Sequence, residues 1–155
     1  MASQNTTLFA AQIGTADFAT DQKIPTSVDA GGRAIIIADT YTPTSTMAAG
    51  TVLGICKLPA GSKVVSVEFI VPASMVTSSA KIGIGTIDAN GVITVTDDDR
   101  YGTALDLSAV GRFQAVKIAA DADYVNSTEV ALVMTITTGT LAALPFAYIV
   151  TYVSA

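Results

Sequence analysis

Ala49–Val71 reads AGTVLGICKLPAGSKVVSVEFIV, and this stretch decides the fold. The apolar run Thr51–Leu58 comes first and is followed by a Pro-Ala-Gly sequence, whose residues favour a turn. Beyond the turn, Lys63–Val71 alternates between apolar and polar residues, the period of a strand with one buried face. The stretch therefore predicts two strands joined by a turn. We expect one face of the second strand to carry Val65, Val67, Phe69 and Val71.

Further strand patterns follow at short spacing from Arg33 to the end of the chain. Asp88–Gly91 contains an Asn-Gly pair, which is typical of a tight hairpin turn between two strands. Gly83 and Gly85 share one face of the strand before that turn, which indicates a bend or the close approach of another backbone. The remaining strands are expected at Ala34–Asp39, Phe113–Ala119, Thr128–Thr137 and Phe146–Val153.

This succession of short strands predicts an all-β fold, because no stretch keeps a helical period. A β-sandwich of the jelly-roll type is the commonest arrangement for about eight such strands. The 155 residues suit a single domain, which we place at residues 33–155. Residues 1–32 lack a period and are expected to form an irregular, extended N-terminal arm. Asp97–Arg112 is expected to be a long loop with one short helical turn.

The chain carries little charge for a protein of its length. Charged residues make up 14% of it and hydrophobic residues 50%, whereas an ordinary globular domain has about 25% charged residues. The longest apolar run, Leu141–Val150, is half as long as a membrane-spanning helix and contains Pro145. The first residues, MASQNTTLFA, do not resemble a signal peptide. We therefore expect a cytoplasmically assembled subunit that has no membrane partner and hides apolar surface in an oligomer.

Several strands are apolar on both faces, including Thr51–Leu58 and Phe146–Val153. A two-layer sandwich buries one face of each sheet, so the second face needs a cover. The loop 97–112, the N-terminal arm or a neighbouring subunit are the candidates. Large apolar residues of the arm and of the last strand are expected at an interface or, for the last strand, in the core. These residues are Leu8, Phe9, Ile13, Phe18, Phe146, Tyr148 and Tyr152.

The residues that carry chemistry are sparse. There is no histidine, which removes the commonest general base and metal ligand, and we expect no enzyme and no cofactor. Asp97, Asp98 and Asp99 are a weak calcium candidate, and an exposed polar loop is the favoured interpretation. The eight lysines and arginines are scattered and the net charge is −5, which argues against nucleic-acid binding. Cys56 is expected to be a small buried hydrophobe, and the glycosylation sequon at Asn126 to be incidental.

An ordered set of motifs carries a family resemblance. Lys57–Gly61 (KLPAG) is followed by an alternating strand, then by Lys81–Thr86 (KIGIGT), then by the stretch AADADYV at 119–125. The chain closes with a Tyr-Val strand at Tyr148–Val153. This set, over roughly residues 33–153, resembles small structural proteins of tailed bacteriophages, of the capsid decoration or cement type.

The resemblance implies a non-enzymatic virion protein that binds the outer surface of a capsid and stabilises it by bridging capsomers. Its implied partners are the major capsid protein and further copies of itself, as a trimer, and its implied location is the capsid surface after assembly in the host cytoplasm. Two alternatives remain. One is a tail, neck or fibre component of the virion, and the other is a β-sandwich module that binds carbohydrate or a cell surface.

Overall fold

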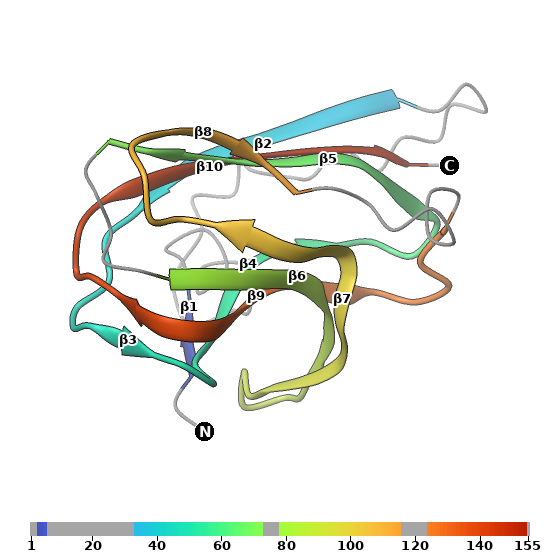
Figure 1. Ribbon diagram of the computed structural model, residues 1–155. Coiled ribbons are helices and arrows are strands. Elements are labelled where there is room, and N and C mark those ends of the chain that lie inside the picture. Colours follow the sequence, from blue (N-terminus) through green and yellow to red (C-terminus); the bar gives the residue numbers. More distant parts are fainter. Residues whose placement is uncertain (1–2, 6–32, 73–77, 116–123, 155) are drawn as a thin grey trace.

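The computed structural model describes residues 3–5, 33–72, 78–115 and 124–154. All regular elements in these ranges are strands, and they form the two stacked sheets visible in Figure 1. The predicted all-β sandwich is therefore confirmed. Most of the expected arm, including Leu8, Phe9, Ile13 and Phe18, lies outside the described residues.

The first sheet runs in the order β1-β4-β9-β6-β7, with β3 pairing separately with β9. Its pairings are antiparallel except that β1 runs parallel to β4. The strands are β1 (Ser3–Asn5), β3 (Met47–Ala48), β4 (Val52–Leu58), β6 (Ser78–Ile87), β7 (Ile93–Asp106) and β9 (Val130–Leu141).

The second sheet is antiparallel throughout and runs in the order β2-β10-β5-β8. Its strands are β2 (Arg33–Tyr41), β5 (Ser62–Val71), β8 (Gly111–Gln114) and β10 (Phe146–Ser154). The eight longer strands can be counted along the chain without the short β1 and β3. In that count, the second sheet contains the first, eighth, third and sixth strands, in this order. The other sheet holds the second, seventh, fourth and fifth, which together make the jelly-roll order expected from the sequence.

The KLPAG turn carries the chain from one sheet to the other. The amide of Ser62 donates to the carbonyl of Pro59 at 3.2 Å, and Gly61 has a φ of 80°. Such a type II turn needs a positive φ at its third residue, and glycine adopts it without strain. The two strands predicted around the turn are present, but they lie in opposite sheets.

The predicted buried face of β5 is wrong at Val65. Ser66 lies opposite Thr151 and Val64 opposite Tyr152, so Val65 is an extra residue in a β-bulge. The extra residue reverses the alternation, so that the inward residues are odd-numbered after the bulge and even-numbered just before it. Val64 is consequently 1% exposed, whereas Val65 is 49% exposed.

The main core lies between the sheets, where the inward residues of both sheets meet. Phe146, Tyr148 and Tyr152 are at most 2% exposed and belong to this core. Tyr148 donates its hydroxyl to the carbonyl of Ile55, on the facing sheet, at 3.2 Å. Of the two places expected for these three side chains, an interface or the core, the structure shows the core, because alternation turns them towards the facing sheet.

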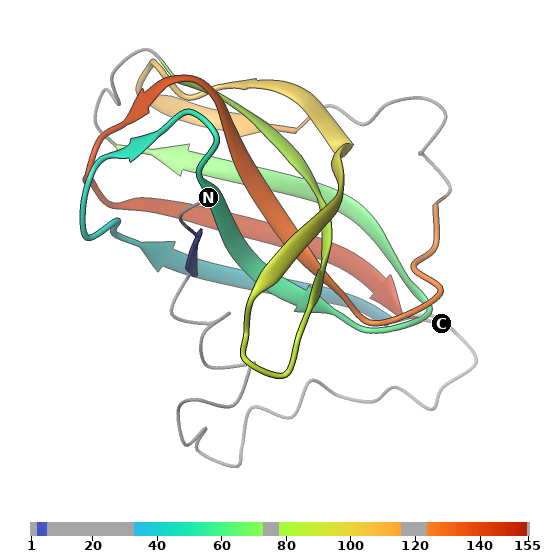
Figure 2. The ribbon, with the colours of Figure 1, turned by 90° about the horizontal axis from the view of Figure 1, so that it is seen from below.

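A small second cluster covers part of the outer face of the first sheet. Val52, Ala131 and Val133 are buried there, and Ile87, Ile93 and Val95 of the β6–β7 hairpin pack on them. Figure 2 shows this hairpin passing across β4 and β9. The β6–β7 hairpin therefore covers this part of the outer face. It was not among the covers expected from the sequence.

The long loop expected at residues 97–112 is also wrong. β7 continues through the aspartates to Asp106, and β8 begins at Gly111. The expected close approach at Gly83 and Gly85 is confirmed, because a Cβ at Gly83 would lie 2.0 Å from the carbonyl oxygen of Asp97. In the described part of the chain, no helix is long and apolar enough to cross a membrane.

Candidate functional site

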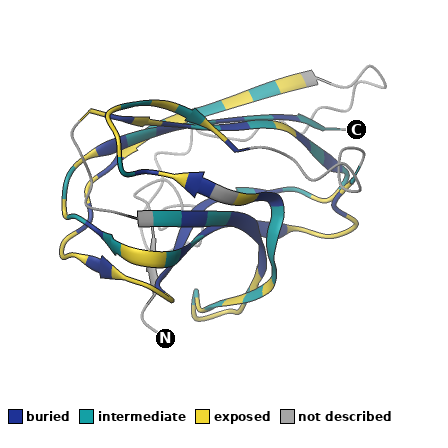
Figure 3. Ribbon diagram, in the orientation of Figure 1, coloured by how far each residue is buried: buried dark blue, intermediate teal, exposed yellow. Residues whose placement is uncertain are grey.

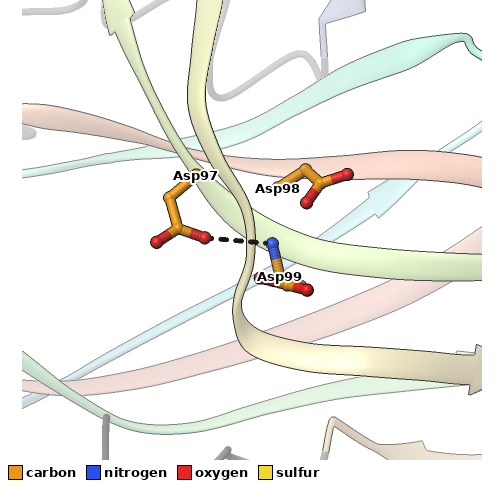
Figure 4. A group of neighbouring side chains, drawn as sticks. All are labelled: Asp97, Asp98 and Asp99. Carbon is orange, nitrogen blue, oxygen red and sulfur yellow. Dashed lines mark hydrogen bonds between the residues drawn. The ribbon is translucent and has the colours of Figure 1, made fainter.

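The acidic run stands in a wide irregularity of the β6–β7 pairing. Ile84 pairs with Asp97 and Ile82 with Gly102, so four residues of β7 face one residue of β6. Irregular pairing of this kind re-aims side chains, and all three aspartates are partly exposed. In Figure 4, Asp97 and Asp98 leave the strand on opposite sides.

Two cations compensate most of the charge of this run. Lys81 Nζ lies 3.1 Å from Asp98 Oδ2 and 3.6 Å from Asp99 Oδ2, and Arg100 lies 2.6 Å from Asp97 Oδ2. The hydrogen bond to Asp98 is the main cause that raises the pKa of Lys81. These pairs explain why a strongly acidic run is tolerated inside a strand.

The fold adds no further carboxylate from the described residues to the weak calcium candidate at Asp97, Asp98 and Asp99. One carboxylate oxygen from each of Asp97, Asp98 and Asp99 lies within 4.8 Å of the others, but calcium takes six to eight oxygens. Asp88, in the β6–β7 turn, accepts the amides of Asn90 and Val92 at 2.8 Å and so closes the hairpin turn. The described residues thus bring together three carboxylates that are already ion-paired.

Asn126, the sequon residue, is a structural residue of the KLPAG turn. Its side chain is 0% exposed and donates to Ser62 Oγ at 2.9 Å, while its carbonyl accepts the Gly61 amide at 2.7 Å. A fully buried amide is inaccessible to a glycosylating enzyme. Cys56 is also 0% exposed, as expected, and burial raises the pKa of its thiol.

The outer side of the second sheet includes the second apolar face expected for Phe146–Val153, and a β2 part that sequence reasoning missed. We call its β2 and β10 part the outer β2–β10 face, where adjacent side chains of the two strands point away from the core. None of its residues is charged, and Ile36 is 67% exposed. Figure 3 shows exposed and partly buried residues alternating along β2. The face consists of Ala34, Ile36, Ala38, Thr40, Ala147, Ile149, Thr151 and Val153.

The far edge of the second sheet carries an ion pair. There, Arg112 of β8 pairs with Glu68 of β5. Val65 and Ile70, on the same strand β5 as Glu68, are 49% and 36% exposed. Alternation within Ala34–Asp39 was the available signal for an exposed Ile36, but a run of three isoleucines hides which of them point outward.

Solved structures of phage capsids show the same fold. The chain superposes on a chain of the capsid of Ralstonia phage GP4 with a TM-score of 0.77, at 17% identity, covering 99% of both chains. It matches a chain of the capsid asymmetric unit of cyanophage Pam1 with a TM-score of 0.52, at 16% identity. That match covers 92% of this chain and 99% of the other. No protein-family model matches the chain, and no curated protein matches it in sequence.

Proposed function

We propose that this protein is a non-enzymatic structural protein of a phage virion that binds the outer surface of the capsid as a cement or decoration protein. The observation that carries the proposal is a jelly-roll fold shared, over 99% of both chains, with a chain of the Ralstonia phage GP4 capsid. The motif set around Lys57–Gly61 supports it independently, since it resembles the same class of protein.

The surface chemistry fits such a role. A cement protein holds neighbouring capsomers together through contact area, and needs neither a catalytic group nor a cofactor. The fold leaves Ile36, Val65 and Val110 exposed by 67%, 49% and 62%, and contact with a particle would cover apolar surface of this kind. The proposed partners are the major capsid protein and further copies of this chain, with the trimer as the proposed oligomer. Leu8, Phe9, Ile13 and Phe18 remain proposed interface residues.

Binding to capsids tests the proposal directly. Purified protein is mixed with phage heads assembled without it, the heads are sedimented, and the bound copies are counted by quantitative gel analysis. We expect saturation at a fixed number of copies per head and a higher temperature of DNA release from decorated heads. Cryo-electron microscopy of the decorated head then locates the density.

Two results would contradict the capsid role. One is density confined to the tail or neck, which would favour the alternative virion component. The other is no saturable binding to heads together with specific binding on a glycan array, which would favour the carbohydrate-binding module.

A further inference from the structure

The strand β2 is an unusual sheet edge. Among the described residues, β10 is the strand that pairs with β2, on one side, and β2 ends the order of the second sheet. Its nine residues carry no proline, lysine or bulge against β10. Natural proteins use such features to stop an exposed edge from pairing with another chain.

The other sheet edges of this chain do carry protection. β8, at the opposite end of the same sheet, has four residues and exposes Arg112 and Gln114. β7 ends the first sheet with the irregular, charged segment Asp97–Arg100, and β1 has three residues. Among the described residues, β2 is thus the long, regular edge strand, and its two charged residues, Arg33 and Asp39, stand at the two ends of its apolar run.

We propose that β2 pairs antiparallel with β2 of a second copy of this chain, across a two-fold axis at Ile36. Residues 33–39 read RAIIIAD, a palindrome in which opposite charges occupy the two ends. In the register centred on Ile36, position 33 meets Asp39 of the other copy, Ala34 meets Ala38, and Ile35 meets Ile37. Each position then faces one of equal size or opposite charge, which favours cross-strand pairing.

Neighbouring registers lose this match. A shift to a centre at Ile37 places Ile35 opposite Asp39, and a centre at Ile35 places Arg33 opposite Ile37. A centre between two residues sets an outward residue against an inward one and puts the two cores on opposite sides of the joined sheet. The register at Ile36 keeps Ala34, Ile36 and Ala38 outward in both copies, as they are in this chain.

The joined sheet would have eight strands, twice the four of the second sheet. It would make the outer β2–β10 faces of both copies continuous and would bring the two Ile36 side chains, each 67% exposed in the single chain, into contact with each other. This contact does not depend on the capsid role. In a trimeric cement protein it would join one trimer to the next, and in a protein without other self-contacts it would make a dimer.

Cysteine cross-linking tests both the contact and its register. Directly opposite residues of an antiparallel pair have Cα atoms about 4.5–5.5 Å apart, which a disulfide can bridge. The native Cys56 is 0% exposed and does not compete. We expect Ile36→Cys to form a disulfide-linked pair of chains under mild oxidation, and Val110→Cys, at a site 62% exposed on another part of the surface, to stay unlinked.

The register is read from two further variants. A mixture of Ala34→Cys and Ala38→Cys proteins, distinguished by a mass tag, should link one chain of each kind. Either variant alone should link poorly, because its two cysteines would be about 13 Å apart along the strands. Efficient linking of Ala34→Cys with itself would overturn the register centred on Ile36.

A mass measurement provides the independent check. Wild-type protein should sediment with an even number of chains. Ile36→Lys places two like charges at the axis and should halve that mass, while the matched variant Val110→Lys should leave it unchanged. Equal masses for wild type and Ile36→Lys, or failure of Ile36→Cys to link above the level of Val110→Cys, would overturn the proposal. Neither result would bear on binding of single chains to capsids.

Discussion

Gly83 offers the sharpest test of how the sandwich is held together. It lies in β6 beneath the irregular part of β7, where a Cβ would meet the Asp97 carbonyl oxygen at 2.0 Å and the Asp98 carbonyl carbon at 2.5 Å. Both are backbone atoms, so no side chain can rotate away to make room. Gly83→Ala therefore forces β7 to shift by about an ångström or more, and this strains the ion pairs of Asp97–Asp99.

The expected cost follows from the size of the overlap. Adding one carbon to a close-packed site costs about 1–3 kcal/mol, and a clash with backbone belongs at the upper end. We expect Gly83→Ala to lower the free energy of unfolding by about 3 kcal/mol, and the melting temperature by about 6–12 °C for a chain of this length. Urea denaturation followed by circular dichroism, at one protein concentration, measures the change.

Gly85 is the matched control in the same strand. A Cβ there would lie 2.7 Å from the Thr94 carbonyl oxygen and 3.1 Å from the Ile93 Cγ2 atom, a milder overlap. Gly85→Ala should cost about 1 kcal/mol. Gly50→Ala meets nothing within 4 Å but sits at a φ of 85°, so it isolates the cost of backbone conformation alone. A Gly83→Ala protein as stable as Gly85→Ala would refute the reasoning.

Three further predictions concern the turn, the thiol and the acidic run. Asn126→Ala should lower the free energy of unfolding by about 1–3 kcal/mol, because it leaves the buried Ser62 hydroxyl without the amide that donates to it; an unchanged urea midpoint would contradict this. Burial raises the pKa of the Cys56 thiol, so a thiol reagent at pH 8 should react with it in urea and not in buffer, and rapid labelling of folded protein would show that the site opens. Millimolar calcium should leave the melting temperature unchanged, because Lys81 and Arg100 already pair with Asp97–Asp99, and a rise of several degrees would show that an ion displaces them.

The local elements of this fold were readable from the chain. The hairpin at Asp88–Gly91, the type II turn at Gly61 and the close approach at Gly83 all depend on a few adjacent residues. Glycine and asparagine adopt positive φ, and the absence of a Cβ admits another backbone, wherever in the fold the segment lies. Such features are therefore predicted correctly without knowledge of the partner strand.

The misread elements depend on strands far away in the chain. Val65 is outward because β5 bulges against β10, more than 80 residues later in the sequence. The acidic run continues β7 because Lys81, on the neighbouring strand, compensates its charge. Taken alone, three aspartates are typical of a loop, because unpaired carboxylates are costly to remove from water.

The sequence by itself determined that this chain is an all-β domain with few charges and without histidine, which limits its chemistry and favours assembly. Tertiary structure decided which apolar residues are core and which are surface. Phe146, Tyr148 and Tyr152 belong to the core, and Ile36 is exposed on the outer face of β2. The physical reason is that a strand's period of two defines its faces, whereas pairing with other strands decides which face is covered and which edge is left open.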